Sequence, residues 1–373
     1  MLSTQINFSD EQAMLLETAV AFCREKSTIR AVRDLLASET GFNRSVWDEM
    51  VGLGWSGIAI PERFGGSGLS MAEVATIAEP MGRHLLATPF GSTQLFVQGI
   101  LAGGSAAQQA LVLPLVAQGG IGTVALVEDD GDWDLSHIEA SATREGDQLR
   151  LSGSKTLVGD AAVAAWFLVS VRLDGAPALV LVDGADLPAA RRQAEVVIDE
   201  TRRCWALDLD GFVVPASGLL SNAAAGLRAI RDAGLLLACA EAAGGIAGVL
   251  DVTVDYLNSR SAFGRKIGSY QSLKHACADI LVGLERSRSH LYHAASLFAG
   301  NQDAEVALRM AKAESGDVFT HAGDRAVQFH GGFGFTYECD AQLFLRRAMW
   351  LQYSFGDAGH HRRKLGELLL DQG

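Results

Sequence analysis

Two long helical patterns joined by a short polar elbow constrain the fold of this chain more than any other feature. An apolar run from Gly226 to Leu257 is typical of a long buried helix, and an amphipathic run from Gln271 to Phe298 predicts a second one. Helical texture then continues to the C-terminus. We therefore expect residues 216–373 to form a C-terminal four-helix-bundle domain.

In the chain before this bundle, the pattern of apolar residues changes once, near residue 119. Residues 1–118 carry apolar positions at helical spacing, beginning with an N-cap candidate at Ser9, whereas residues 119–215 alternate or run apolar over strand lengths. Because no βαβ alternation occurs, a doubly wound sheet is excluded. The expected fold is α+β and multi-domain: an N-terminal α-helical domain, a small antiparallel barrel or sandwich, and the helical C-terminal domain. The expected strands cover 123–128, 140–145, 148–158, 166–172, 177–183, 196–199 and 205–211.

Charge and cysteine usage limit the possible partners. Lys and Arg number 31 against 44 Asp and Glu, a net charge of −13, so neither nucleic acid nor an anionic membrane surface is expected as a partner. The apolar run at 233–250 is interrupted by Glu241 and glycines, as in a buried helix rather than a membrane span. The five cysteines are scattered without a C-x-x-C pair, and no signal-peptide pattern opens the chain. A reducing, cytoplasmic location is therefore expected.

Two polar stretches carry the clearest chemistry. The elbow at 260–271 places cations and amide donors beside glycines at a helix junction, which suits a bound phosphate or pyrophosphate. The second stretch, R-A-V-Q-F-H-G-G-F-G-F-T-Y-E-C-D (325–340), places Gln328 ahead of glycines that let a ligand approach the backbone. The structural alternative for the elbow is a helix–helix turn with a glycine cap and a solvated Arg260.

The two stretches read R-x-x-F-G-x-x-I-G-x-x-Q and Q-x-H-G-G-x-G, and together they resemble the acyl-CoA dehydrogenase family, the flavoenzymes that make 2-enoyl-CoA. Near the start, L-G-W-S-G-I-A-I-P-E-R-F-G-G-S-G-L-S (53–70) and E-P-M-G-R-H-L-L-A-T-P-F (79–90) are similar to motifs of the family's first domain. The resemblance therefore covers almost the whole chain.

The resemblance implies FAD held between two subunits of a tetramer. One chain contacts the pyrophosphate and adenosine, and the rest of the flavin lies in the neighbouring chain's pocket. A bidentate guanidinium, amide side chains and glycine N–H groups suit that role. The implied flavin-contact residues of this chain are Arg260, Phe263, Gln271, Gln328, Gly331 and Gly332.

The half of the family's flavin site that meets the isoalloxazine ring matches poorly. The family's first strand ends T-E-P-G-A-G-S-D, whereas this chain has V-E-D-D-G-D-W-D (127–134), which brings three further acids towards an anionic cofactor. A later Trp-Ile-Thr that packs on the flavin reads Leu157-Val158-Gly159 here.

The family's catalytic glutamate is also missing. Its reaction removes a C2 proton while C3 delivers hydride to flavin N5, and one glutamate takes the proton. The first family position for that residue, after R-R-A-M-W-L-Q (346–352), is Phe355; the second, early on the long helix, is Gly234. Neither residue can accept a proton.

Three carboxylates could replace the missing base. Glu241 lies two helical turns after Gly234 and could line the acyl pocket, with a pKa raised by apolar surroundings, although a buried helix carboxylate is more often a structural ion-pair partner. Asp357 is closer to the first position but suits an N-cap, and Asp232 suits a solvated place at a helix start. The pair His360-His361 is expected at the surface rather than at a metal site.

Three hypotheses remain open. The first makes the chain one subunit of an α2β2 acyl-CoA dehydrogenase, in which a second acyl-CoA dehydrogenase-like chain supplies the base and acyl pocket. The second is a self-sufficient homotetramer with Glu241 as the catalytic base. The third is a non-catalytic scaffold subunit without flavin. The resemblance implies an acyl-CoA substrate, with bulky acyl groups such as steroid side chains included, and an electron-transfer flavoprotein or oxygen as acceptor.

Overall fold

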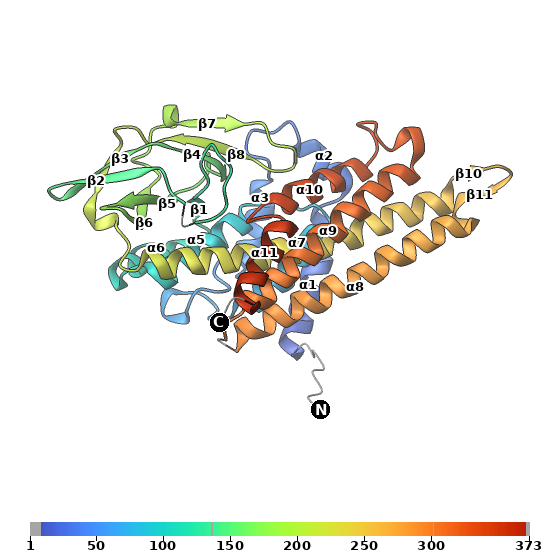
Figure 1. The fold of residues 1–373 in the computed structure, drawn as a ribbon, viewed down its shortest axis with the longest axis horizontal. Coiled ribbons are helices and arrows are strands. Elements are labelled where there is room, and N and C mark those ends of the chain that lie inside the picture. The colour runs from blue at the N-terminus through green and yellow to red at the C-terminus, as the bar shows by residue number, and fades with distance from the viewer. Residues whose placement is uncertain (1–8, 136, 301, 371–373) are drawn as a thin grey trace.

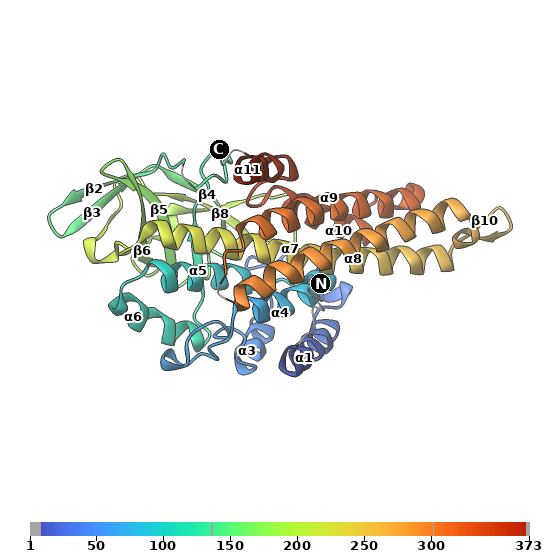
Figure 2. The same ribbon diagram turned by 60° about the horizontal axis from the view of Figure 1, so that its bottom comes forward.

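The structure is a computed structural model that describes residues 9–135, 137–300 and 302–370. A helical N-terminal part, a β-rich middle part and a helical C-terminal part follow one another, as Figure 1 shows. The expected fold class is therefore confirmed. The β-domain forms one end of the molecule, and the long C-terminal helices extend away from it towards the other end (Figures 1 and 2).

Side-chain caps mark where several helices of the N-terminal domain begin. Ser9, Ser70 and Ser105 each form a capping box with the residue three positions later. The cap at Ser9 was expected from the sequence and is confirmed. The helices are α1 (Asp10–Lys26), α2 (Ile29–Leu35), α3 (Arg44–Gly52), α4 (Met71–Arg83), α5 (Phe90–Gly103) and α6 (Ala106–Ala117), with a short 3-10 turn, η1 (Glu62–Phe64).

The middle domain contains two sheets. The larger has the order β1-β5-β2-β3-β9, with β6 also on β5, and the smaller is the antiparallel order β4-β8-β7. Both β1 and β2 pair with β5 in parallel, so the domain is mixed rather than purely antiparallel. The strands are β1 (Gly122–Ala125), β2 (Ser141–Glu145), β3 (Gln148–Ser152), β4 (Ser154–Gly159), β5 (Trp166–Leu173), β6 (Ala176–Asp183), β7 (Arg192–Glu195), β8 (Cys204–Asp208) and β9 (Val213–Pro215).

Two strand predictions were wrong in detail. The run 148–158 is not one strand but two, because Gly153 has a left-handed backbone (φ +105°) that passes the chain from one sheet to the other. The run 196–199 is not a strand, because β7 ends at Glu195, whose carboxylate accepts the Leu157 N–H (2.7 Å). The chain then leaves the sheet and turns inwards at Asp199, which is buried.

The helix α7 (Ala223–Ser259) is the core of the molecule. It packs against α4 and α5 of the N-terminal domain and against α8, α9 and α10 of the C-terminal domain. It is long and apolar enough to cross a membrane, but 94% of its most apolar window is buried inside the protein, as expected for a core helix. The other helices here are α8 (Gln271–Ala299), α9 (Glu305–Phe329), α10 (Ala341–Tyr353) and α11 (Ala358–Leu370).

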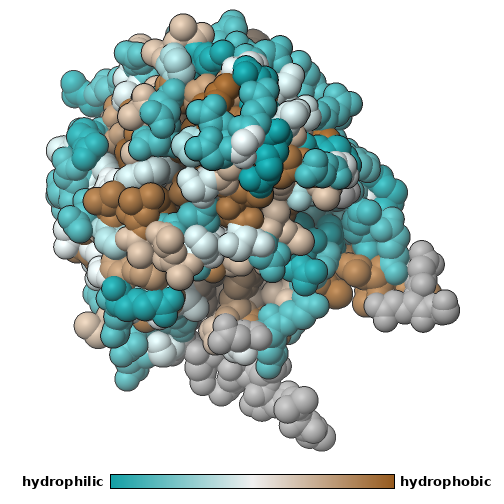
Figure 3. Space-filling model, turned by 90° about the vertical axis from the view of Figure 1, so that its left-hand side faces the viewer, coloured by the Kyte–Doolittle hydropathy of each residue, from teal (hydrophilic) through white to brown (hydrophobic). Residues whose placement is uncertain are grey.

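Close helix packing joins the first and last domains. A Cβ atom at Gly244 of α7 would lie 1.8 Å from the Glu79 carbonyl oxygen of α4, so only glycine allows this approach. The middle of α7, the loop before α5 and the β-domain meet around one junction. The opposite end of the β-domain has a mainly hydrophilic surface with smaller apolar areas (Figure 3).

Candidate functional site

The elbow projects beyond the rest of the bundle (Figures 1 and 2). After α7 ends, β10 (Ser261–Ala262) and β11 (Arg265–Lys266) form a two-strand turn, closed by the Ile267 N–H, which donates to the Arg260 carbonyl (3.0 Å). At its tip Phe263 has a left-handed backbone (φ +53°) and a side chain that is 94% exposed. An aromatic ring held in this way is available to a ligand or to a neighbouring chain.

The second stretch forms a turn at the same end of the bundle, here called the glycine turn (residues 330–336). The His330 ring stacks on the Tyr256 ring, with 4.1 Å between centroids, and the Tyr256 hydroxyl donates to the His330 carbonyl (3.3 Å). Gly331 is left-handed (φ +62°), and both it and Gly332 are exposed. Because Tyr256 precedes the elbow by one helical turn, the two stretches are neighbours in space.

The donors of these two segments fit a pyrophosphate. Arg260 is exposed, and within the described part of the chain its guanidinium has no ion-pair partner. Gln271 is the first residue of α8, whose N-terminus has no side-chain cap and so offers its first-turn N–H groups to an anion. Gln328 is exposed in the last turn of α9. A charged fork, amides and an uncapped helix end are the donor types that the pyrophosphate of FAD requires.

A separate cavity of about 150 Å³ lies where the three domains meet. Residues of the loop before α5, β1, β4, α7 and α10 line it, and most of its wall is apolar. Both expected base positions border this cavity, which makes it the candidate acyl pocket of this chain. Its lining includes Thr88, Ser92, Trp133, Asp160, Arg202, Gly234, Glu241 and Phe355.

The two expected base positions meet at one point of the cavity wall. A Cβ atom built on Gly234 would lie 2.3 Å from Cζ of Phe355, so the aromatic ring occupies the space that a side chain at 234 would need. Phe355 itself has a left-handed backbone (φ +59°), followed by Gly356 at φ +97°. One apolar ring therefore fills the space at both positions where the resemblance predicts a carboxylate.

A tryptophan covers that ring from the β-domain side. The rings of Trp133 and Phe355 lie 4.5 Å apart between centroids, at an angle of 39°. Trp133 belongs to the divergent loop 127–134, and sequence reasoning noted the loop's extra acids but missed this contact. The three further acids, Asp129, Asp130 and Asp132, are exposed, and none of them lines the cavity. The divergent loop therefore changes the cavity through Trp133, which packs on Phe355.

The carboxylate of that loop that does match the family has a structural role. Glu128 accepts the Glu139 N–H (2.7 Å) and the Ala140 N–H (2.9 Å), and it pairs with the fully buried Lys155 (2.6 Å). Burial would raise the pKa of Glu128, but the hydrogen bonds from Lys155 and from the two backbone N–H groups lower it overall. This pair joins β4 to the loop that follows β1.

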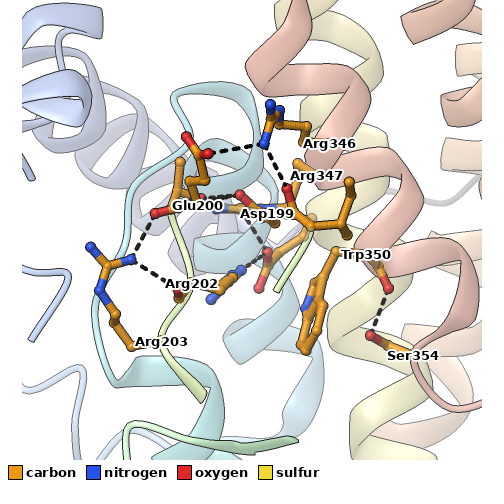
Figure 4. Close-up of polar contacts among 11 residues, drawn as sticks. Asp199, Glu200, Arg202, Arg203, Arg346, Arg347, Trp350 and Ser354 are labelled. Atoms are coloured by element: carbon orange, nitrogen blue, oxygen red, sulfur yellow. Dashed lines mark hydrogen bonds and ion pairs between the residues drawn. The ribbon is translucent and has the colours of Figure 1, made fainter. Parts of the chain in front are cut away.

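Glu241 lies in a buried cluster of charges; Figure 4 shows Arg202, Arg347 and Asp199 of this cluster. The Glu241 carboxylate accepts hydrogen bonds from Arg202 and from Arg347, the latter at 3.1 Å. Arg347 is completely buried, binds Asp199 as well, and donates to the Thr201 hydroxyl (2.5 Å). The charges of Arg202 and Arg347 thus compensate those of Asp199 and Glu241. These contacts are the ones expected if Glu241 is a structural ion-pair partner rather than a base. Glu241 does border the cavity, as expected, but with both arginines attached.

The polar edge of the cavity contains residues that sequence reasoning missed. Asp160 follows β4 with a left-handed backbone (φ +55°), and the Ser92 hydroxyl donates to its carboxylate (2.6 Å). Burial raises the pKa of Asp160, and the Ser92 hydrogen bond opposes this. The Thr88 hydroxyl is buried without a hydrogen-bond partner among the described residues. In the sequence, only Asp160, directly after Leu157-Val158-Gly159, could have indicated a polar edge of the cavity.

The remaining candidate residues do not line the cavity. Asp357 accepts the His360 N–H (2.7 Å) at the start of α11, which is the N-cap role expected of it. Asp232 is not solvated but pairs with Arg231 (2.8 Å). The prediction that both histidines are exposed was wrong, because His361 of α11 is 1% exposed where this helix packs against α9. Within the described ranges, no group of three or more His, Cys, Asp or Glu side chains could hold a metal ion.

Comparisons with known proteins cover both helical domains. The sequence profile of the acyl-CoA dehydrogenase N-terminal domain matches residues 9–120, and that of the acyl-CoA dehydrogenase C-terminal domain matches residues 232–370. Among characterised relatives, acyl-CoA dehydrogenase IpdE2 of Mycobacterium tuberculosis is 30% identical over 346 residues, covering 91% of each protein.

Solved structures share the whole fold. A variant of the Tcur3481-Tcur3483 steroid ACAD matches with a TM-score of 0.88 and 28% identity, covering 97% of this chain and 98% of that one. The ChsE4-ChsE5 complex of Mycobacterium tuberculosis matches with a TM-score of 0.90 and 24% identity, covering 99% and 100%. The latter similarity concerns the fold alone.

Proposed function

The chain belongs to the acyl-CoA dehydrogenase family of FAD-dependent oxidoreductases, and we propose that it is the flavin-contact subunit of a heteromeric acyl-CoA dehydrogenase. In this proposal a second acyl-CoA dehydrogenase-like chain supplies the catalytic base, the acyl pocket and the contacts to the flavin ring. The reaction is α,β-dehydrogenation of an acyl-CoA thioester.

One observation carries the proposal. Phe355 packs into the space above Gly234, so both family positions for the base lie in the same apolar contact and neither holds a proton acceptor. At the same time the donors suited to pyrophosphate and adenosine are present and exposed at the far end of the bundle. A chain that keeps one half of the flavin site and has lost the other suits an assembly in which unlike chains complete each other.

The contribution of this chain to the reaction is binding and orientation. FAD, when bound, supplies the hydride acceptor. Arg260 would hold the pyrophosphate through its guanidinium fork, with Gln271 and the N-terminus of α8 donating to the same group. Gln328 and the backbone of Gly331 and Gly332 would contact the adenosine side, and Phe263 would cover it. None of these residues exchanges a proton with the substrate.

The apolar contact in the cavity supports a base in the partner chain. Trp133 and Phe355 line the cavity from two domains, and Glu241, a buried carboxylate that borders it, is paired with two arginines. A relocated base at Glu241 stays a second candidate, because its side chain does border the cavity. That arrangement requires Arg202 to release the carboxylate before it can accept a proton.

We also propose a substrate, an electron acceptor and a cellular location for this chain. The similar Tcur3481-Tcur3483 structure is named as a steroid ACAD and carries two protein names, which supports a bulky acyl-CoA substrate such as a steroid side-chain thioester and a heteromeric assembly for this chain. We further propose an electron-transfer flavoprotein as acceptor. All five cysteines are free thiols, which suits the reducing cytoplasm.

The decisive experiment compares the chain expressed alone with the chain co-purified with the product of a neighbouring acyl-CoA dehydrogenase-like gene. We expect the isolated chain to hold no flavin and to show no turnover, and the co-purified complex to be yellow and active with about one flavin for every two chains, by analogy with the family. A yellow, active homomer would overturn the proposal. A co-purified complex without FAD at the shared interface would instead favour the scaffold hypothesis.

A further inference from the structure

The segment that joins the glycine turn to α10 is attached to the N-terminal domain by one arginine. Arg33 of α2 donates from Nε and Nη2 to the Asp340 carboxylate (3.0 and 2.7 Å). It also donates from Nη1 to the Tyr337 carbonyl (3.0 Å) and from Nη2 to the Glu338 carbonyl (3.0 Å). A single guanidinium therefore fixes three points of a segment more than 300 residues later in the sequence.

A glutamate completes this attachment from the β-domain side. The Tyr337 hydroxyl donates to Glu200 (2.7 Å), and Arg346 donates to the other oxygen of the same carboxylate (3.1 Å; the second contact is drawn in Figure 4). Glu200 follows the buried Asp199 directly and so stands on a fixed part of the chain. The segment 337–340 is thus held from two domains at once, an arrangement here called the α2 clamp (Arg33, Glu200, Tyr337 and Asp340).

The glycine turn lies between two anchors. On its N-terminal side, His330 stacks on Tyr256 of α7. On its C-terminal side is the α2 clamp. Between them, Phe333 and Phe335 are 46% and 78% exposed, and the turn is closed by hydrogen bonds within itself, such as Gly334 N–H to Gly331 carbonyl (2.9 Å) and Thr336 hydroxyl to Phe333 carbonyl (2.8 Å). A surface turn with so little packing of its own keeps one shape mainly through its ends.

We propose that Arg33 is a positioning residue for FAD: it pre-organises the glycine turn for the adenosine and pyrophosphate, although it does not touch the cofactor. The inference rests on the proposed function, since it assumes that the glycine turn contacts FAD. Because ordering a flexible loop on binding weakens affinity, a turn held in advance binds more tightly. Loss of Arg33 should therefore lower FAD affinity and leave the chemical step unchanged.

The test uses the apo form of the co-purified complex, titrated with FAD and followed by flavin fluorescence, with turnover measured at saturating FAD. Arg33→Ala is expected to raise the FAD dissociation constant at least tenfold while kcat at saturating FAD stays within twofold. Arg33→Lys should recover part of the affinity, because an ammonium can still pair with Asp340 but cannot span both carbonyls. Arg30→Ala is the matched control, since Arg30 lies on the same helix with a side chain that is 91% exposed.

Two further variants make every outcome decisive. Arg260→Ala tests the proposed function itself: if it loses FAD while Arg33→Ala binds normally, only the present inference fails. If both variants bind FAD normally, the flavin-contact role of this chain fails as well. Should Arg33→Ala not assemble with its partner, Asp340→Ala provides the measurement, because it removes the carboxylate that accepts two of the four Arg33 hydrogen bonds; unchanged FAD affinity in that variant overturns the inference. Equal loss of FAD in Arg30→Ala and Arg33→Ala would also overturn it.

Discussion

Replacing Glu241 by glutamine separates a catalytic role of this residue from a structural one. Glutamine has nearly the same shape as glutamate, so the substitution removes only the negative charge. If Glu241 were the catalytic base, losing it would lower kcat by about 10²- to 10⁴-fold. If it is a structural partner, the activity of the complex should stay within about twofold and the cost should appear in stability. The contacts to Arg202 and Arg347 lead us to expect the second result.

The expected size of the stability loss follows from the cluster around Glu241. The charge removed is one of two anions facing two arginines, of which Arg347 is completely buried. Glutamine can still accept one hydrogen bond, so the loss should lie below the full cost of breaking a buried pair, at about 2–4 kcal/mol. With an unfolding entropy of about 2.1 cal/mol/K per residue, a chain of 373 residues unfolding as one unit would lose about 3–5 °C in Tm.

The assay combines turnover of an acyl-CoA by the co-purified complex with thermal unfolding of the same preparation. Glu79→Gln is the matched control: Glu79 is a buried carboxylate bonded to Arg288 (2.8 Å), and it does not border the cavity. Both variants should lose stability and keep activity. A hundredfold drop in kcat for Glu241→Gln, with Tm and KM unchanged and Glu79→Gln active, would refute the structural role and restore Glu241 as the base.

Three other perturbations test separate parts of the structure. Arg260→Ala should remove most FAD from the purified complex, seen as loss of the flavin absorbance, while size-exclusion chromatography still shows the assembled chains. Gly234→Ala should lower the free energy of unfolding by about 1–3 kcal/mol, because its Cβ would lie 2.3 Å from the Phe355 ring. In a Phe355→Ala background the same substitution should cost less, and equal losses in both backgrounds would contradict the contact. Burial, followed by the charges of Lys312, the neighbouring histidine and Arg309, lowers the pKa of His361 to about 3. The unfolded chain then binds a proton near pH 6.5 that the native state excludes, so stability should be fully present above pH 6.5 and fall by about 2 kcal/mol by pH 5; His361→Leu should flatten this dependence in denaturant titrations.

The sequence could predict the parts of this protein that depend on neighbours in the chain. Ser9 at a helix start, the 37-residue helix α7 and the elbow that follows it were all evident from periodicity and capping residues. The glycine turn and Arg260 were evident as motifs, because phosphate-type sites use residues at fixed short spacings. That Phe355 and Gly234 cannot accept a proton was evident as well, and their identity as the family's base positions stays a prediction from the resemblance.

Only the tertiary structure decided how residues distant in the chain are combined. Phe355 and Gly234 turned out to share one contact, Trp133 joined them from another domain, and Glu241 met its two arginines from β-domain and α10 segments. The buried position of His361, like the attachment of Arg33 to the 337–340 segment, has no signal at short range. Periodicity and capping arise from hydrogen bonds within a few residues, so they can be read locally. Ion-pair partners and aromatic contacts depend on which surfaces α7 brings together, and that is decided when the three domains pack.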